Sequence, residues 1–179
     1  LADASSGVGL ITTAPEIDGL VRRVPLVVNV GDNLYPTFAL EMLRVGTGDP
    51  SYQIITKETG VEAIRIPSYP VISTDPHARV WTTWNTQFHR QSASDYLKEP
   101  VEGATFVIFG VTAEGVANPV PTPGGPKFAH EIQANLLHGL IAGDAPSEPV
   151  WAATAELAVA VIIILLLFVT ATNVYFSAP

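Results

Sequence analysis

The spacing of apolar residues predicts a strand followed by a helix near the start of the chain. Val24 to Val30 form a nearly continuous β-branched run, which is typical of a buried strand. The apolar residues between Phe38 and Leu43 then share one helical face, with Pro36 in the expected first turn. Gly46 and Gly48 are expected to stop this helix. A strand that leads into a helix indicates an α/β unit.

The same reasoning predicts four further elements before residue 110. The first is a hairpin of Gln53–Thr56 and Val61–Ile66, and the second is a strand Val80–Trp84 that follows a turn at Asp75-Pro76. The third is a short helix through Tyr96 and Leu97, capped by Ser92 or Ser94. The fourth is an apolar run over Thr105–Phe109. The last run is typical of a central parallel strand.

A second long helix is predicted after a Pro-rich loop, because Phe128, Ile132, Leu136 and Leu140 recur every four residues. Gly143 is expected to end it. The solvent-facing positions of this helix are expected to be Glu131, Gln133, Asn135 and His138. Beyond it, Pro146 and Pro149 predict a short stiff linker.

The end of the chain has the pattern of a membrane-spanning helix. Every residue from Leu157 to Val169 is Leu, Ala, Val, Ile or Phe. A helix from Trp151 to Tyr175 would be about 36 Å long, enough to cross a hydrocarbon core of about 30 Å with an aromatic residue at each interface. The alternative is the buried core helix of a soluble protein. The predicted organisation is therefore a domain over residues 1–150 and a transmembrane helix with its flank over residues 151–179.

Composition and charge narrow the class of protein. Of 179 residues, 47% are hydrophobic and 15% charged, and 17 acidic residues outnumber 9 basic ones, which excludes a disordered chain and a basic nucleic-acid binder. No Lys or Arg follows Lys127, so the positive-inside rule places the approach to the span on the outer side. The lack of Cys excludes disulfides, thiolate metal sites and Cys nucleophiles. Residue 1 begins no signal peptide, so the chain looks cut at its start.

Sequence signals for catalysis, metals and cofactors are weak. None of the imidazoles forms an i, i+4 pair; they are His77, His89, His130 and His138. No Gly-x-Ser-x-Gly elbow or phosphate-binding loop is present, and the stretch Gly7-Val8-Gly9 follows no predicted strand. Asp75 and His77 could form an acid/base pair, but a turn is the favoured interpretation. We therefore expect no metal site, no catalytic site and no cofactor.

Two places are candidates for ligand binding. Arg22 and Arg23 stand at the entrance of a predicted strand in an otherwise acidic domain. Thr112 and Glu114 lie in the loop after the predicted central strand, where ligands of open α/β sheets collect. The alternative is an ordinary strand-to-loop turn with solvated charges.

These residues resemble the second type of CHASE sensor domain, the cyclases/histidine kinases associated sensory extracellular modules. Asp18-Gly19-Leu20-Val21-Arg22-Arg23-Val24-Pro25-Leu26 is similar to the family's signature of Asp-Gly, two hydrophobic residues, Arg-Arg, any residue and Pro-Leu. Further similar stretches are Pro36–Arg44, Val107–Ala113, Thr122-Pro123, Glu131–Asn135 and Pro149–Trp151 with Glu156-Leu157. Gln133 departs from the pattern, which has a His there, and the resemblance implies that the family's first half would precede Leu1.

The resemblance implies an extracytoplasmic sensory domain of a bacterial signalling receptor in the cell inner membrane, with a nucleotide cyclase or a kinase as its cytoplasmic output. The expected fold is α/β, a partial mixed sheet flanked by helices and followed by one transmembrane helix. The expected partners are a small-molecule or periplasmic ligand, membrane lipid and a second copy in a homodimer, with no nucleic acid. The alternatives are a membrane-anchored α/β hydrolase and a membrane adaptor that binds a protein through its acidic face.

Overall fold

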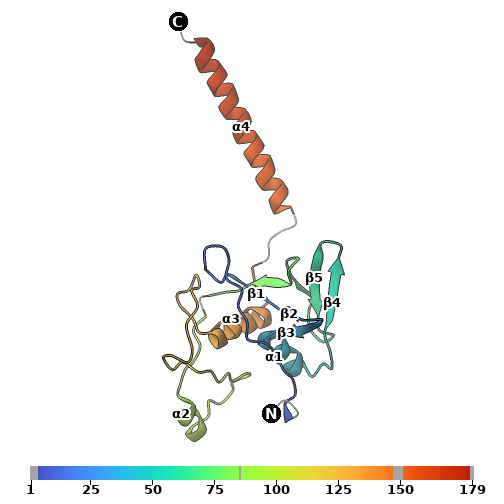
Figure 1. Cartoon of the computed structure of the whole chain (residues 1–179), viewed down its shortest axis with the longest axis vertical. Coiled ribbons are helices and arrows are strands. Elements are labelled where there is room, and N and C mark those ends of the chain that lie inside the picture. The colour runs from blue at the N-terminus through green and yellow to red at the C-terminus, as the bar shows by residue number, and fades with distance from the viewer. Residues whose placement is uncertain (1–3, 85, 147–150, 178–179) are drawn as a thin grey trace. The chain divides into compact units, whose positions relative to one another are not determined.

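The chain folds into two compact units, Leu1–Pro146 and Ser147–Pro179 (Figure 1). The computed structural model describes residues 4–84, 86–146 and 151–177, the side chains of residues 153 and 173–177 excepted. Within these residues the architecture is α/β, with small sheets and four helices, which confirms the predicted class.

The strands form three separate small sheets. β1 (Arg23–Pro25) pairs with β7 (Arg79–Trp81), β2 (Val27–Val30) pairs with β3 (Asn33–Pro36), and β5 (Gly60–Arg65) pairs with β4 (Gln53–Lys57) on one side and β6 (Ile72–Ser73) on the other. All these pairings are antiparallel. The predicted hairpin is therefore confirmed as β4 and β5, and the predicted strand at Val80 is confirmed in a shorter form.

Three helices belong to the first unit: α1 (Phe38–Thr47), α2 (Ala93–Lys98) and α3 (Ala129–Ala142). Gly48 and Gly143 end α1 and α3 in left-handed conformations, with φ of 73° and 67°. The side chain of Ser92 caps α2 by accepting the backbone N–H of Asp95 at 3.1 Å. The cap of α2 and the ends at Gly48 and Gly143 agree with the sequence predictions. Gly46, however, lies within α1 and does not stop it, and Pro36 closes β3 instead of lying in the first turn of α1.

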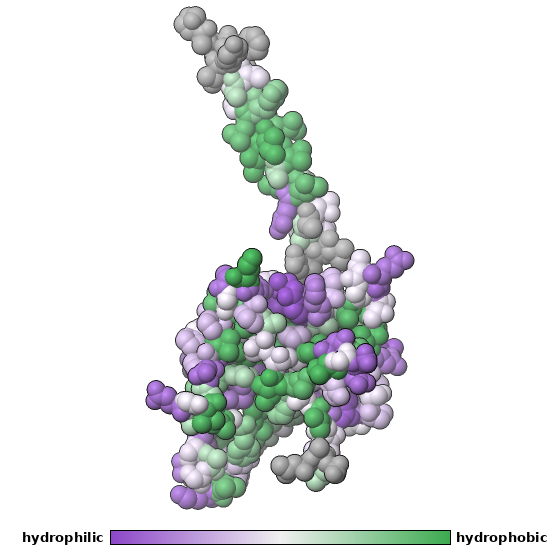
Figure 2. Space-filling view, in the orientation of Figure 1, coloured by the Kyte–Doolittle hydropathy of each residue, from purple (hydrophilic) through white to green (hydrophobic). Residues whose placement is uncertain are grey.

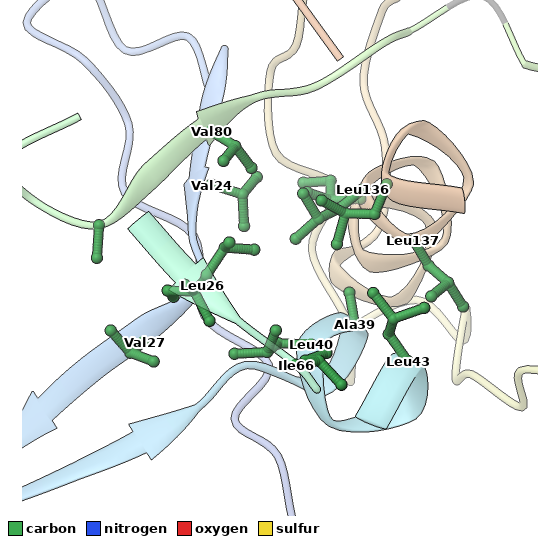
Figure 3. Close-up of a cluster of buried hydrophobic side chains, with 14 of the residues drawn as sticks. Val24, Leu26, Val27, Ala39, Leu40, Leu43, Ile66, Val80, Leu136 and Leu137 are labelled. Carbon is green, nitrogen blue, oxygen red and sulfur yellow. The ribbon is translucent and has the colours of Figure 1, made fainter. Parts of the chain in front are cut away.

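The core lies where α1, α3 and the β1–β7 pair meet (Figure 3). Leu40 of α1, Leu136 of α3 and Val24 of β1 point into the same space and are almost fully excluded from solvent. The buried apolar residues of this cluster are Val21, Val24, Leu26, Val27, Ala39, Leu40, Leu43, Ile64, Ile66, Ala78, Val80, Ile132, Leu136, Leu137 and Leu140. Burial of this set is the main stabilising contribution to the unit.

Gln133 joins three parts of the chain at the centre of this core. Its side chain is fully buried, and its Oε1 accepts the backbone N–H of Ala39 at 3.0 Å, in the first turn of α1. Its Nε2 donates to the carbonyl of Thr12 at 3.4 Å. The hydroxyl of Thr37, the N-cap residue of α1, donates instead to the carbonyl of Leu26 at 3.2 Å. Gln133 of α3 thus supplies the acceptor that a helix N-terminus normally takes from its own cap.

The solvent face predicted for α3 is wrong at three of its four positions. Only His138 is exposed, whereas Gln133 and Asn135 are buried and the side chain of Glu131 is 12% exposed. Core packing surrounds most of α3, and the amide nitrogens of the side chains that enter the core donate to backbone carbonyls. Asn135, for example, donates through Nδ2 to the carbonyl of Glu131 at 2.7 Å.

The single strand predicted over Val24–Val30 is in fact two strands. The chain changes partner at Leu26, whose N–H donates to the carbonyl of Ala78 at 2.8 Å. β1 before it is buried, while β2 after it belongs to a hairpin whose outer residues, including Val30, are exposed. Pro25, which has no N–H to donate, precedes this change of partner.

The central parallel strand predicted over Thr105–Phe109 does not form among the described residues. Phe106 and Ile108 are half-buried, whereas Val107 and Phe109 are exposed. The residues have high strand propensity, but no neighbouring strand lies beside them in the described part of the chain. A strand requires a hydrogen-bonding neighbour as well as suitable side chains.

The second unit consists mainly of α4 (Ala152–Ser177), a helix of 26 residues. Its stretch Thr154–Thr172 has a mean hydropathy of 2.6 and is not buried, so α4 is long and apolar enough to cross a membrane. Figure 2 shows apolar side chains along most of this helix. Its one charged residue is Glu156, near the start. Trp151 is exposed, while the side chain of Tyr175 and the linker residue Pro149 lie outside the described residues.

The role of Gln133 can be tested by replacing it with leucine, which has a similar size. Gln133→Leu leaves the N–H of Ala39 and the carbonyl of Thr12 without their partner in the core, so we expect the free energy of unfolding to fall by about 2 to 4 kcal/mol. Urea unfolding of the detergent-solubilised chain, followed by tryptophan fluorescence, measures this change. Gln87→Leu is the matched control, because Gln87 is exposed. Equal effects of the two substitutions would contradict the role assigned to Gln133.

Candidate functional site

A tight turn before β1 positions the first pair of candidate residues. The N–H of Glu16 donates to the carbonyl of Leu20 at 2.9 Å, and Gly19, with φ of 81°, donates back to the carbonyl of Glu16 at 2.9 Å. Oδ1 of Asp18 accepts the N–H of Leu20 at 3.1 Å. The Asp-Gly pair therefore forms a turn in which glycine takes the left-handed backbone conformation.

This turn holds carboxylates against both candidate arginines. Arg22 donates to Glu16 at 2.9 Å and to Asp18 at 2.7 Å. Arg23 donates to the other oxygen of Glu16 at 2.9 Å and lies 5.1 Å above the ring of Trp81, in a cation–π contact. Glu16 thus brings the two guanidinium groups together.

Asp75 extends the cluster to β7. Its Oδ2 accepts from Arg79 at 2.8 Å and from Arg23 at 3.2 Å, while its Oδ1 accepts the backbone N–H groups of His77 and Arg79, both at 2.9 Å. The carboxylate is therefore bonded to the backbone of His77 and not to its imidazole, as expected for a turn. We call the six charged residues the carboxylate–arginine cluster; they are Glu16, Asp18, Arg22, Arg23, Asp75 and Arg79. Three carboxylates and three guanidinium groups leave it with no net charge.

The arginines shift the titration of the carboxylates. Hydrogen bonding from Arg23 lowers the pKa of Glu16 below its ordinary value; partial burial opposes this shift and Arg22 adds to it. Hydrogen bonding from Arg22 lowers the pKa of Asp18, and the N–H of Leu20 acts in the same direction. Both carboxylates are therefore charged at neutral pH.

Thr112 and Glu114 lie in an irregular loop and are exposed. In the described residues, no hydrogen bond or ion pair connects either of them to Arg22 or Arg23. A concavity of about 580 Å³ opens to solvent at the tip of the β4–β5 hairpin, lined by Thr56, Lys57, Glu58 and Thr59, so it contains none of the four candidates. The structure thus brings Arg22 and Arg23 together and leaves Thr112 and Glu114 separate from them.

The imidazoles lie in different surroundings. His89 contacts Gln91 at 3.1 Å, His130 stacks on Phe128 with ring centres 5.8 Å apart, and His138 meets Phe88 edge-on at 6.1 Å. The described residues contain no group of three or more His, Asp or Glu side chains placed to hold a metal ion.

Comparison with known protein families identifies the family of this chain. The model of the CHASE2 domain family matches residues 2–172, nearly the whole chain. The chain belongs to the CHASE2 family. This confirms the resemblance found in the sequence, and CHASE2 domains are extracellular sensory domains of signalling receptors. No curated protein and no solved structure matches the chain.

In this CHASE2 domain the Asp-Gly to Arg-Arg block is the centre of an ion-pair network. Sequence reasoning singled out Arg22 and Arg23, and it assigned Asp75 to a turn only. It missed the contacts of Glu16 and Trp81 with Arg23 and the pairing of Arg79 with Asp75. The spacing of four residues between Asp18 and Arg22, and again between Asp75 and Arg79, was the available signal. The contact between Arg23 and Asp75 joins residues 52 positions apart, so only the fold reveals it.

The lowered pKa values predict an acid-sensitive domain. A carboxylate whose pKa is lower in the folded state stabilises the fold above its unfolded pKa, and this stabilisation is lost as the pH falls through the folded value. We expect the free energy of unfolding to decrease as the pH falls below about 4.5, the ordinary pKa of Glu16, and Glu16→Gln to make this decrease shallower. Urea unfolding at several pH values measures the slope.

The control for this pH series is Glu58→Gln, which removes an exposed carboxylate from the β4–β5 turn. The control should keep the wild-type dependence on pH. An unchanged slope in Glu16→Gln would show that the contacts of Glu16 with the two arginines do not contribute to acid sensitivity.

Proposed function

We propose that this CHASE2 domain and α4 form the input side of a bacterial receptor in the cell inner membrane. The first unit lies outside the cytoplasm, and its ligand state controls a nucleotide cyclase or a kinase on the cytoplasmic side. The observation that carries this proposal is the division of the chain: every basic residue precedes residue 128, whereas α4 contains a single charged residue, Glu156. A charged sensory domain joined to an apolar helix is suited to carry a signal across a bilayer.

In this proposal the ligand is a small molecule or a periplasmic protein, and Arg22 and Arg23 are its first candidates for recognition. The side chain of Arg22 is 30% exposed and that of its partner Asp18 is 45% exposed, so an anionic group can compete with Asp18 for the guanidinium. Exchange of one carboxylate for another would loosen the turn at Gly19 without leaving Arg22 unpaired. Thr112 and Glu114 form a second, separate candidate in an exposed loop.

The signal would leave the domain through α3, the last helix before α4. Contacts around α3 come from several parts of the unit: Tyr69 donates through its hydroxyl to the carbonyl of Leu140, Arg90 pairs with Glu131 at 2.9 Å, and Gln133 holds α1. A shift of α3 between two arrangements would require a ligand that binds one arrangement better than the other.

The proposed topology can be tested with single cysteines, because the chain contains none. Asp144→Cys and Ala178→Cys place thiols before and after α4. In intact cells, we expect a membrane-impermeant maleimide to label the first at once and the second only after the cells are opened. The cysteine-free chain is the control for background labelling. Labelling of both positions, or of neither, in intact cells would contradict a span that crosses the membrane once.

The proposed coupling can be tested by softening the linker between α3 and α4. In the receptor that contains this domain, replacing Pro146 and Pro149 together by Gly should reduce the change in output on stimulation several-fold and leave ligand affinity nearly unchanged. The measurement is cyclase or kinase activity with and without stimulus at equal expression. The matched control is Pro119→Gly, a proline in an exposed loop of the same unit. Normal signalling in the double variant would show that the signal reaches the membrane through another element.

A further inference from the structure

The segment Thr105–Val111 has the properties of a strand without a neighbour. Its side chains alternate: Phe106 and Ile108 are half-buried, while Val107, Phe109 and Val111 are 39%, 61% and 57% exposed. No hydrogen bond in the described structure involves the backbone of residues 104–112. Strand-forming residues with a free backbone are a template for pairing with another strand.

The inner face of this segment is fixed to the helical layer at both ends. The ring of Phe106 approaches Gly46 of α1 so closely that a Cβ at position 46 would lie 2.6 Å from it. At the other end, a Cβ at position 110 would lie 2.2 Å from the imidazole of His130 in α3. The segment therefore reaches from α1 to α3, and the close contacts at its two ends fix the position of its outer face.

The outer face is apolar and symmetric in sequence. Val107, Phe109 and Val111 form a Val-x-Phe-x-Val pattern, and residues 104–113 contain no charged side chain. The ring of Tyr96 in α2 supports Phe109 edge-on, with ring centres 5.5 Å apart. We call the three side chains the 107–111 stripe. A two-fold axis through Phe109 would place Val107 of one copy opposite Val111 of the other, so the stripe is complementary to itself.

Charges at the ends of the segment favour this alignment. With Phe109 opposite Phe109, Glu102 faces Val116 of the second copy and Glu114 faces Ala104, so no two acidic residues are opposed. An alignment centred one residue earlier, on Ile108, would place Glu102 directly opposite Glu114 of the second copy, and the two carboxylates would repel each other. The charges thus disfavour the alignment centred on Ile108, and the apolar pattern favours the one centred on Phe109.

We infer that the 107–111 stripe is an interface between two copies of this chain, paired as antiparallel strands about Phe109. The partner is a second copy because the stripe matches itself under two-fold rotation about Phe109, an alignment that opposes no two acidic residues. The inference concerns assembly and is independent of the ligand and the output proposed above.

Cysteine cross-linking tests the contact in the full chain in detergent micelles. In antiparallel pairing, directly opposed residues have Cα atoms about 4.5 to 5.5 Å apart, within the range that a disulfide bridges. Phe109→Cys should therefore form a disulfide-linked dimer on mild oxidation. The control Ile17→Cys, at a fully exposed residue in the turn of the carboxylate–arginine cluster, should remain monomeric. Equal cross-linking of the two variants would overturn the inference.

Charge substitutions test the alignment itself. V107K with V111K places like charges opposite each other and should raise the dimer dissociation constant about tenfold or more, whereas V107K with V111E opposes unlike charges and should restore association at low salt. Sedimentation velocity measures the dissociation constants. A monomeric wild-type chain, or equal effects of the two double variants, would overturn the inference. A wild-type dimer unaffected by V107K with V111K would also overturn it, because association would then depend on another surface.

Discussion

The fold of the sensory unit depends on the hydrogen bonding of the backbone N–H groups at the N-terminus of α1, which lies inside the core. A helix that begins at a buried position exposes backbone N–H groups that need acceptors, and Thr37, the residue at the cap, directs its hydroxyl elsewhere. Gln133 supplies the acceptor from α3 and uses its own N–H group to bind the carbonyl of Thr12. One side chain therefore fixes the relative position of two helices and the N-terminal segment, around which the apolar cluster packs.

The N-terminal segment can reach this position because glycines let it lie directly on α1. The N–H of Leu10 donates to the carbonyl of Pro36 and its carbonyl accepts from Phe38, both at 2.9 Å. A Cβ at Gly9 would lie 2.6 Å from the Cα of Phe38. Gly7-Val8-Gly9, which carried little information in the sequence, is thus a site of close backbone approach. Gln133 holds the same N-terminal segment at Thr12.

The sequence correctly predicted elements whose signals are local. The predictions failed where residues far apart in the chain determine the pairing or burial of an element. The ends of α1 and α3, the β4–β5 hairpin and the cap of α2 follow from glycine, serine and short-range apolar spacing. The strand at Val24–Val30 was misjudged because its two halves pair with β7 and β3, which composition does not reveal. Gln133 was placed in solvent because an amide is ordinarily exposed, and its burial depends on the helix that packs against it. The sequence singled out Arg22 and Arg23 as candidates for ligand binding, but the carboxylates that pair with them were recognised only from the fold.

The carboxylate–arginine cluster and α3 differ in how readily their contacts can change. The cluster lies at the surface and is made of partly exposed ion pairs, each of which contributes little and can exchange partners. α3 lies in the core, and its length is bonded to distant segments through Glu131, Gln133 and the carbonyl of Leu140. Because close-packed interiors deform little, a change at one contact of α3 moves the helix as a whole more readily than it bends it. The first unit therefore combines an exchangeable ion-pair network at its surface with a rigid helix in its core, and a contact that changes in the network need not disturb the packing of α3.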